Sequence, residues 1–153
     1  MTSLNIFNIQ TAIAGLTTAT TLYTDGDVLG TAPMSWNLGF DKGIIGTAVL
    51  VNATVNIGAV DLFLFDRSVT AAANNAAHAI SDADRLFAIG IIQFPFPSND
   101  SNGQTSAIDS LGLTWIANAA NTIYGIPVTR STHTVHFGAA TDLQFALFGC
   151  QDV

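Results

Sequence analysis

Short apolar runs, rich in β-branched residues, alternate with turn-forming residues along most of this chain. Residues 44–66 predict two strands that meet at a turn near residues 56–58. Residues 89–96 predict another strand, which Pro95 and Pro97 stop. Regular short spacing of such segments predicts a sandwich or a barrel. The last third of the chain carries four further segments of this kind, over residues 113–119, 122–130, 133–140 and 142–151.

The middle of the chain adds more strands and one helix. Residues 21–30 predict a strand, a tight turn at residues 25–27 and a second strand, and residues 32–43 predict another strand. Ser81 has the character of an N-cap followed by acidic residues, which predicts a short helix over residues 82–87. With about eight strands, we predict an all-β fold, a jelly-roll-like β-sandwich with one short helix. A Greek-key sandwich with another strand order is the alternative.

No linker or internal repeat divides the sequence. We therefore expect a single β-sandwich domain over residues 1–153, in which residues 1–20 form an extended N-terminal strand or arm. Residues 97–110 are polar and predict a loop.

The segment VDLFLF, residues 60–65, has two apolar faces. In a strand, Leu62 and Leu64 point to one side, and Phe63 and Phe65 point to the other. A sheet with one face in water alternates apolar and polar residues instead. We therefore expect a second layer, a loop such as 97–110, or another subunit to cover the second face.

Charge is scarce in this protein, and this favours a subunit that packs among neighbours. The sequence is 49% hydrophobic and 10% charged, whereas soluble domains carry about 25% charged residues. Its net charge is -7, and no basic stripe exists that would bind phosphates, so we expect no nucleic-acid partner and no membrane partner. The first residues lack the basic region of a signal peptide, and the single Cys150 excludes an internal disulfide. The cations are Lys42, Arg67, Arg85 and Arg130.

Residue patterns for catalysis, metal binding and cofactor binding are weak. His133 and His136 lie an odd number of positions apart, so a regular strand would place them on opposite faces, where they cannot share one metal ion. Asp61 and Asp66 are also separated by an odd number of positions, so they too would lie on opposite faces of the strand. We interpret the two aspartates as solvated strand ends, and His78 as an exposed or locally hydrogen-bonded side chain. Asp-Gly-Asp at residues 25–27 is explained by a turn without calcium. Phosphate loops and the G-x-S-x-G motif do not occur, so we expect no cofactor, no metal and no enzymatic activity.

Aromatic side chains supply the candidates for contact with a partner. Phe94 and Phe96 share one face of a strand that ends at prolines. With Phe63 and Phe65, they form the predicted set of partner-contact residues. An aromatic sugar platform that includes Trp36 and Trp115 is a second interpretation, although aromatics of β-sandwiches are more often core or interface residues.

Three stretches resemble small virion proteins of tailed bacteriophages. They read DLFLFD (61–66), NNAAHAISDADRLFAIGII (74–92) and PVTRSTHTVHFGAATDLQFALFGCQD (127–152). The resemblance spans roughly the last 95 residues and includes a D-L-x-L-F-D strand, an S-D-A-D helical turn and a final strand that ends in Gln-Asp. Asn74 and His78 depart from the family pattern, which has an aspartate and an aromatic residue there.

The resemblance implies a capsid decoration or cement protein. Such a protein binds the outer surface of the head, bridges subunits of the major capsid protein, and forms a homo-oligomer, a dimer or a trimer. It is assembled in the host cytoplasm and resides in the virion. A tail or baseplate protein that binds host carbohydrate is the alternative, and a β-sandwich enzyme is a third class.

Overall fold

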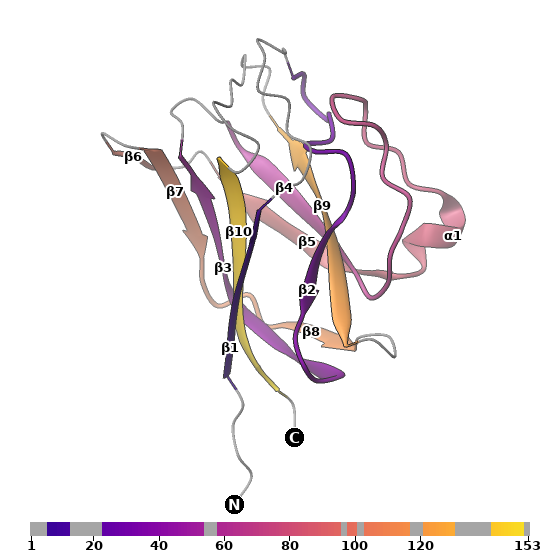
Figure 1. Ribbon diagram of the computed structural model, residues 1–153, viewed down its shortest axis with the longest axis vertical. Coiled ribbons are helices and arrows are strands. Elements are labelled where there is room, and N and C mark those ends of the chain that lie inside the picture. The colour runs from indigo at the N-terminus through magenta and orange to yellow at the C-terminus, as the bar shows by residue number, and fades with distance from the viewer. Residues whose placement is uncertain are drawn as a thin grey trace, which may run out of the picture.

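The fold is a sandwich of two antiparallel β-sheets with one short helix, which confirms the predicted all-β class (Figure 1). Ten strands and the helix lie within the part of the chain that the structure, a computed structural model, describes. This part comprises residues 6–12, 23–53, 58–95, 98–100, 103–116, 121–130 and 142–151.

The larger sheet has the strand order β1-β10-β3-β7-β6, and β8 pairs with the other end of β3. The smaller sheet has the order β2-β9-β4-β5. The strands of the larger sheet are β1 (Ile6–Ala12), β3 (Lys42–Asn52), β6 (Ser98–Asp100), β7 (Gly103–Ile108), β8 (Leu113–Ile116) and β10 (Leu143–Gln151). Those of the smaller sheet are β2 (Met34–Asn37), β4 (Val60–Phe65), β5 (Ala88–Phe94) and β9 (Thr122–Thr129).

The chain crosses repeatedly from one sheet to the other. β1 and β3 belong to the larger sheet and β2 and β4 to the smaller one, so the chain changes sheet after each of these strands. β5 follows β4 in the smaller sheet, and β6, β7 and β8 follow in the larger sheet. It then crosses to β9 and back to β10. These crossings make each sheet from distant parts of the sequence, so the sandwich depends on long-range pairing. The jelly-roll order is a finer assignment and stays a prediction.

The main core lies between the two sheets. Leu62 and Leu64 of β4 are fully buried there, as the sequence predicts for one face of this strand. Phe94 of β5 meets Phe145 of β10 edge to face across the sandwich, with ring centroids 5.5 Å apart. Gly125 of β9 lies against Trp36 so closely that an added Cβ would be 2.7 Å from the indole ring. A side chain at this position would therefore displace the largest residue of the core.

A second, smaller core covers the other face of the smaller sheet. Phe65 of β4 packs there with Ile126 and Val128 of β9, and Val28 and Val69 complete the buried cluster. Residues 66–87 connect β4 to β5 and run along the outside of this sheet, on the side away from β3 and β10 (Figure 1). The second apolar face of β4 is thus covered mainly by the next segment of the same chain.

The prediction of a loop over residues 97–110 is wrong, because most of these residues form β6 and β7. Polar residues are tolerated inside a sheet when their hydrogen bonds are satisfied. The Asn52 side chain of β3 donates to the buried Gln104 side chain of β7 over 3.0 Å. The polar composition of this segment therefore gave no sign in the sequence that it forms strands.

Local hydrogen bonds form the short helix and the turn at residues 25–26. Ser81 caps α1 (Asp82–Arg85) by accepting a hydrogen bond from the Asp84 backbone N–H over 3.1 Å, which confirms the helix but makes it shorter than predicted. Residues 25–26 form the predicted turn, yet residues 27 and 28 make only isolated bridges, so the strand pair expected over 21–30 is not formed by the described residues. Asp27 serves this turn, because its carboxylate accepts hydrogen bonds from the backbone N–H and the hydroxyl of Thr24.

Candidate functional site

Of the three predicted partner-contact residues that the structure describes, Phe63 alone is partly exposed, and it borders a hollow of the surface. Phe65 and Phe94 are each 1% exposed, one in the outer core and one in the main core, so the expectation that they contact a partner is wrong. Each belongs to a strand that has an apolar layer of this chain on that side. Phe96 lies outside the described residues.

Other sequence candidates also prove to be internal. Trp36 and Trp115 are buried, which supports their interpretation as core residues and not as a platform that binds sugar. Asp61 is not a solvated strand end: its carboxylate is buried and accepts a 2.7 Å hydrogen bond from Nε of Arg130. Asp66, by contrast, makes a 3.0 Å ion pair with its exposed neighbour Arg67. His133 and His136 lie outside the described residues.

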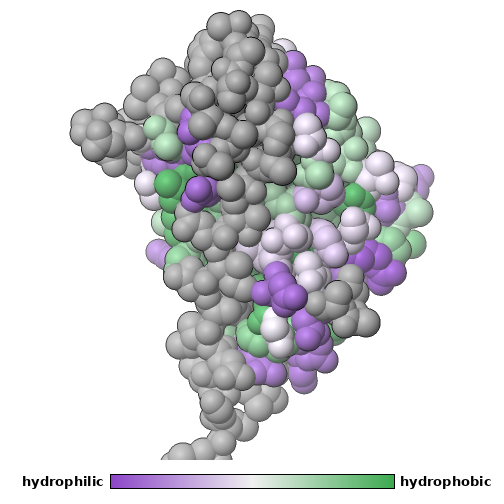
Figure 2. Space-filling view, viewed as in Figure 1, coloured by the Kyte–Doolittle hydropathy of each residue, from purple (hydrophilic) through white to green (hydrophobic). Residues whose placement is uncertain are grey.

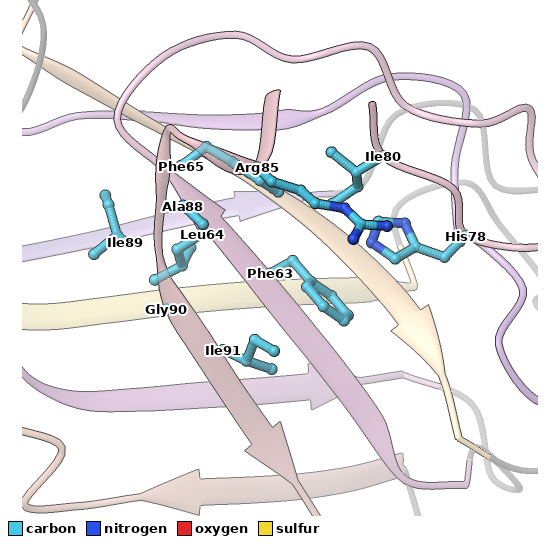
Figure 3. Close-up of a pocket in the computed structure, with 10 residues that line it drawn as sticks. All are labelled: Phe63, Leu64, Phe65, His78, Ile80, Arg85, Ala88, Ile89, Gly90 and Ile91. Carbon is cyan, nitrogen blue, oxygen red and sulfur yellow. The ribbon is translucent and has the colours of Figure 1, made fainter. Parts of the chain in front are cut away.

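An apolar pocket of about 420 Å³ opens between β4, β5 and the segment that covers the outer core (Figure 3). We call it the β4–β5 pocket. Its walls are mostly hydrocarbon, because β4 presents Phe63 and β5 presents Ile91 toward it, while Ile89 borders it and packs on the main core. The connecting segment and α1 supply the rest of the lining with Ile80, His78 and Arg85.

His78 brings the main polar function into this pocket. Its ring stacks obliquely on Phe63 with centroids 4.4 Å apart, and both ring nitrogens are shielded from solvent with no hydrogen-bond partner in the described part of the chain. The interpretation of His78 as exposed or locally hydrogen-bonded is therefore wrong. Burial, together with the positive charges of Arg130 and Arg85, lowers the pKa of this imidazole below its ordinary value of 6.5. A neutral imidazole at pH 7 offers one N–H donor and one acceptor nitrogen.

Arg85 places a cation at the same end of the pocket. Figure 3 shows its guanidinium group reaching over the pocket toward the His78 ring. Its contact with Asp82 on α1 is long, 3.9 Å, and both side chains are mostly exposed, so this ion pair holds the guanidinium weakly. The pocket thus has an apolar body and one end where cationic and hydrogen-bonding groups meet.

A second hollow of about 510 Å³ lies between β3, β8 and the start of β5. We call it the β3–β8 groove. Leu86, directly after α1, is 83% exposed at its edge, and Ile116 of β8 is 73% exposed. Ile44 of β3 is 38% exposed between them. Lys42 and Asp66 add one charge of each sign to the lining.

Large apolar side chains border both hollows in the described part of the chain. No three of its described His, Cys, Asp and Glu residues converge into a metal site. No helix in the described ranges is long and apolar enough to cross a membrane. Hydrophilic and hydrophobic residues are intermixed on the face seen in Figure 2, with many residues near the middle of the hydropathy scale.

Comparison with protein-family models, with curated proteins and with solved structures finds no match to this chain. The site therefore has to be interpreted from its own geometry.

Sequence reasoning did not find Leu86, Ile116, His78 or Arg85 as site residues. Leu86 carries a partial signal, because it directly follows the short acidic turn that Ser81 caps. Ile116 reaches the β3–β8 groove, and His78 and Arg85 reach the β4–β5 pocket, through contacts between segments that are distant in sequence.

The buried imidazole predicts a pH-dependent stability. Because the pKa of His78 is lower in the folded protein, the unfolded chain takes up the proton first as the pH falls below about 6.5. His78 therefore contributes a loss of stability at acid pH and none above pH 7. We expect the melting temperature of the wild type to fall more between pH 7.5 and pH 5 than that of His78→Phe, which keeps a ring against Phe63 and does not titrate. Parallel melting curves for the two proteins would contradict this assignment.

Proposed function

We propose that this protein is a non-enzymatic structural subunit that works by adhesion to other protein subunits. The observation that carries the proposal is the β3–β8 groove, where Leu86 and Ile116 expose most of their side chains around a hollow of mixed polar and apolar lining. Burying one such side chain contributes about 1.5–3 kcal/mol. Exposed apolar side chains that gather around a hollow mark interaction sites more often than scattered ones do.

The groove also has features that orient a partner. Its apolar centre is accompanied by Lys42 and Asp66, so a partner with complementary charges would dock in a defined register. Interfaces of this kind combine an apolar centre with a polar rim. The low content of charged residues in the whole chain, 10%, supports a protein that works among neighbours.

The assembly that we propose is the head of a tailed bacteriophage, with the major capsid protein as partner and the virion surface as location. The resemblance of residues 61–66, 74–92 and 127–152 to small virion proteins supports it. The repeated crossing between sheets supports a jelly-roll order, and jelly rolls occur in viral capsid domains. The comparison with viral capsid domains is an analogy at the level of the fold. The net charge of -7 suits the outer side of a shell, away from packaged DNA.

On this proposal the mechanism is bridging. A subunit that binds two neighbouring capsid proteins makes their separation require the loss of its own contacts as well. Homo-oligomers repeat the bridge, and repeated modest contacts add through high effective concentration. The groove would supply the contact to the capsid protein, which leaves other surfaces for contact between copies.

The double variant Leu86→Asp/Ile116→Asp tests the adhesive role. Because both side chains are exposed, we expect the change to alter the free energy of unfolding by less than about 1 kcal/mol. Two buried carboxylates would, however, prevent docking. We expect binding to purified heads that lack the protein to fall at least about tenfold, measured by cosedimentation at equal protein concentration.

A control variant separates adhesion from charge. Thr70→Asp/Thr105→Asp adds the same two negative charges at exposed positions away from the groove, and it should bind heads as the wild type does. Equal binding by both double variants would refute the groove as the contact. A wild-type chain that is a stable monomer and is missing from purified virus particles would refute the capsid role itself.

A further inference from the structure

The β4–β5 pocket is a separate feature from the groove, and adhesion does not need it. We propose that it binds a small amphipathic monocarboxylate, with the hydrocarbon part against Phe63 and Ile91 and the carboxylate against Arg85. This inference goes beyond the structural role, and either can hold without the other.

The apolar part of the ligand is indicated by the lining. Phe63, Ile80 and Ile91 line the pocket, and Ile91 of β5 is 50% exposed although it is large and apolar. A hydrocarbon chain or ring in the pocket would cover these side chains and release water from them. At about 420 Å³ the pocket lies toward the lower end of the size range of small-molecule sites. It suits a short ligand.

The anionic end of the ligand is indicated by the distribution of charge. The whole chain has four Lys and Arg residues, and two of them, Arg85 and Arg130, act electrostatically on the His78 ring. Arg130 is already paired with Asp61, whereas Arg85 has only the long contact with Asp82 among the described residues. A planar guanidinium binds a carboxylate with two parallel hydrogen bonds, so Arg85 is the group suited to hold the ligand head.

His78 strengthens this choice of head group. Its two ring nitrogens are shielded and lack partners in the described part of the chain, and such groups destabilise a structure until a partner is found. A carboxylate beside Arg85 accepts hydrogen bonds, and Figure 3 shows the guanidinium directed toward the imidazole. A small movement of the ring would let its N–H donate to the same carboxylate. An uncharged head group would leave the guanidinium without this pairing.

Octanoate, octanol and octylammonium are suitable probes because they share a chain and differ in the charge of the head. Each probe is titrated into the full-length protein, whose isoleucine methyl groups are labelled for NMR. The shifts of the methyl signals report both the affinity and the binding site. We expect octanoate to bind with a Kd on the order of 0.1–1 mM and to shift the methyl signals of Ile80 and Ile91. Octanol should bind about tenfold more weakly, and octylammonium more weakly still.

Two arginine variants provide the matched test. Arg85→Gln should weaken octanoate binding about tenfold and leave octanol binding unchanged. Arg67→Gln removes the same charge from a side chain that packs on Phe87 and does not line the pocket, so it should bind octanoate as the wild type does. Thermal melting of each variant checks that the fold is retained.

Three outcomes would overturn the proposal. One is equal affinity of the wild type and Arg85→Gln for octanoate. Another is octanol or octylammonium binding as tightly as octanoate. The third is a set of shifts confined to Ile44 and Ile116, which would place the probe in the β3–β8 groove. None of these outcomes bears on binding to heads, so the test leaves the proposed adhesive function to its own experiment.

Discussion

Replacing Leu62 with alanine is expected to lower the free energy of unfolding by about 2–5 kcal/mol. Leu62 is fully buried in the main core, and its side chain lies beside Gly125 and the indole of Trp36, so the surroundings cannot collapse easily into the space that it leaves. Urea denaturation followed by far-ultraviolet circular dichroism would measure the loss, with an unchanged m-value as the sign that the unfolding transition is otherwise the same.

Phe63→Ala is the matched substitution on the opposite face of the same strand. Phe63 is half-buried and borders the β4–β5 pocket, so we expect a smaller loss of stability although more atoms are removed. A larger loss for Phe63→Ala than for Leu62→Ala would mean that the outer core, rather than the space between the sheets, dominates stability.

Replacing Arg130 with methionine is expected to have the second-largest effect on stability. The Asp61 carboxylate is buried and bonded to the Arg130 Nε over 2.7 Å, so removing the guanidinium leaves a buried charge without this partner. Loss of one member of a fully buried ion pair costs about 3–5 kcal/mol. The Arg130 side chain is 40% exposed, so solvent screening reduces our expectation to about 1–3 kcal/mol, measurable by the same urea titration.

The double variant Asp61→Asn/Arg130→Met identifies the cause of that loss. Asparagine keeps the shape of the aspartate and removes its charge, so the double variant should be more stable than Arg130→Met alone. If the double variant is equally or less stable, the effect of Arg130 comes from packing of its hydrocarbon stem rather than from the ion pair.

The fold class was predictable because its signals are local. Short apolar runs, rich in β-branched residues only in β3, β5 and β9, marked β3, β4, β5, β9 and β10, and the Ser81 cap marked α1. The sequence failed where tertiary contacts reverse a local preference. β7 accommodates the buried Gln104 because its side chain accepts a hydrogen bond inside the sheet. Asp27 and Val28 form single bridges with different segments, to Ala77 and to Val128 of β9.

The candidate site was less predictable than the fold. Period-two alternation correctly separated the two faces of β4, but it did not reveal that Phe65 is covered by the chain itself while Phe63 remains at a pocket. Arg85 and His78 follow β4 in sequence and return to it only because residues 66–87 fold back over the sheet. Asp61 and Arg130 are 69 positions apart and meet through the pairing of β4 with β9.

The strand β5 forms a shared wall, since Ala88 and Ile89 border both the β4–β5 pocket and the β3–β8 groove. An occupant of one hollow that reached these two residues would contact part of the lining of the other. Thermodynamic reciprocity then requires that, if a small molecule in the pocket changes the affinity for a neighbouring subunit, the subunit changes the affinity for the molecule by the same factor. Because only the strand β5 separates the two hollows, ligand binding in the β4–β5 pocket and subunit binding in the β3–β8 groove would then be energetically linked.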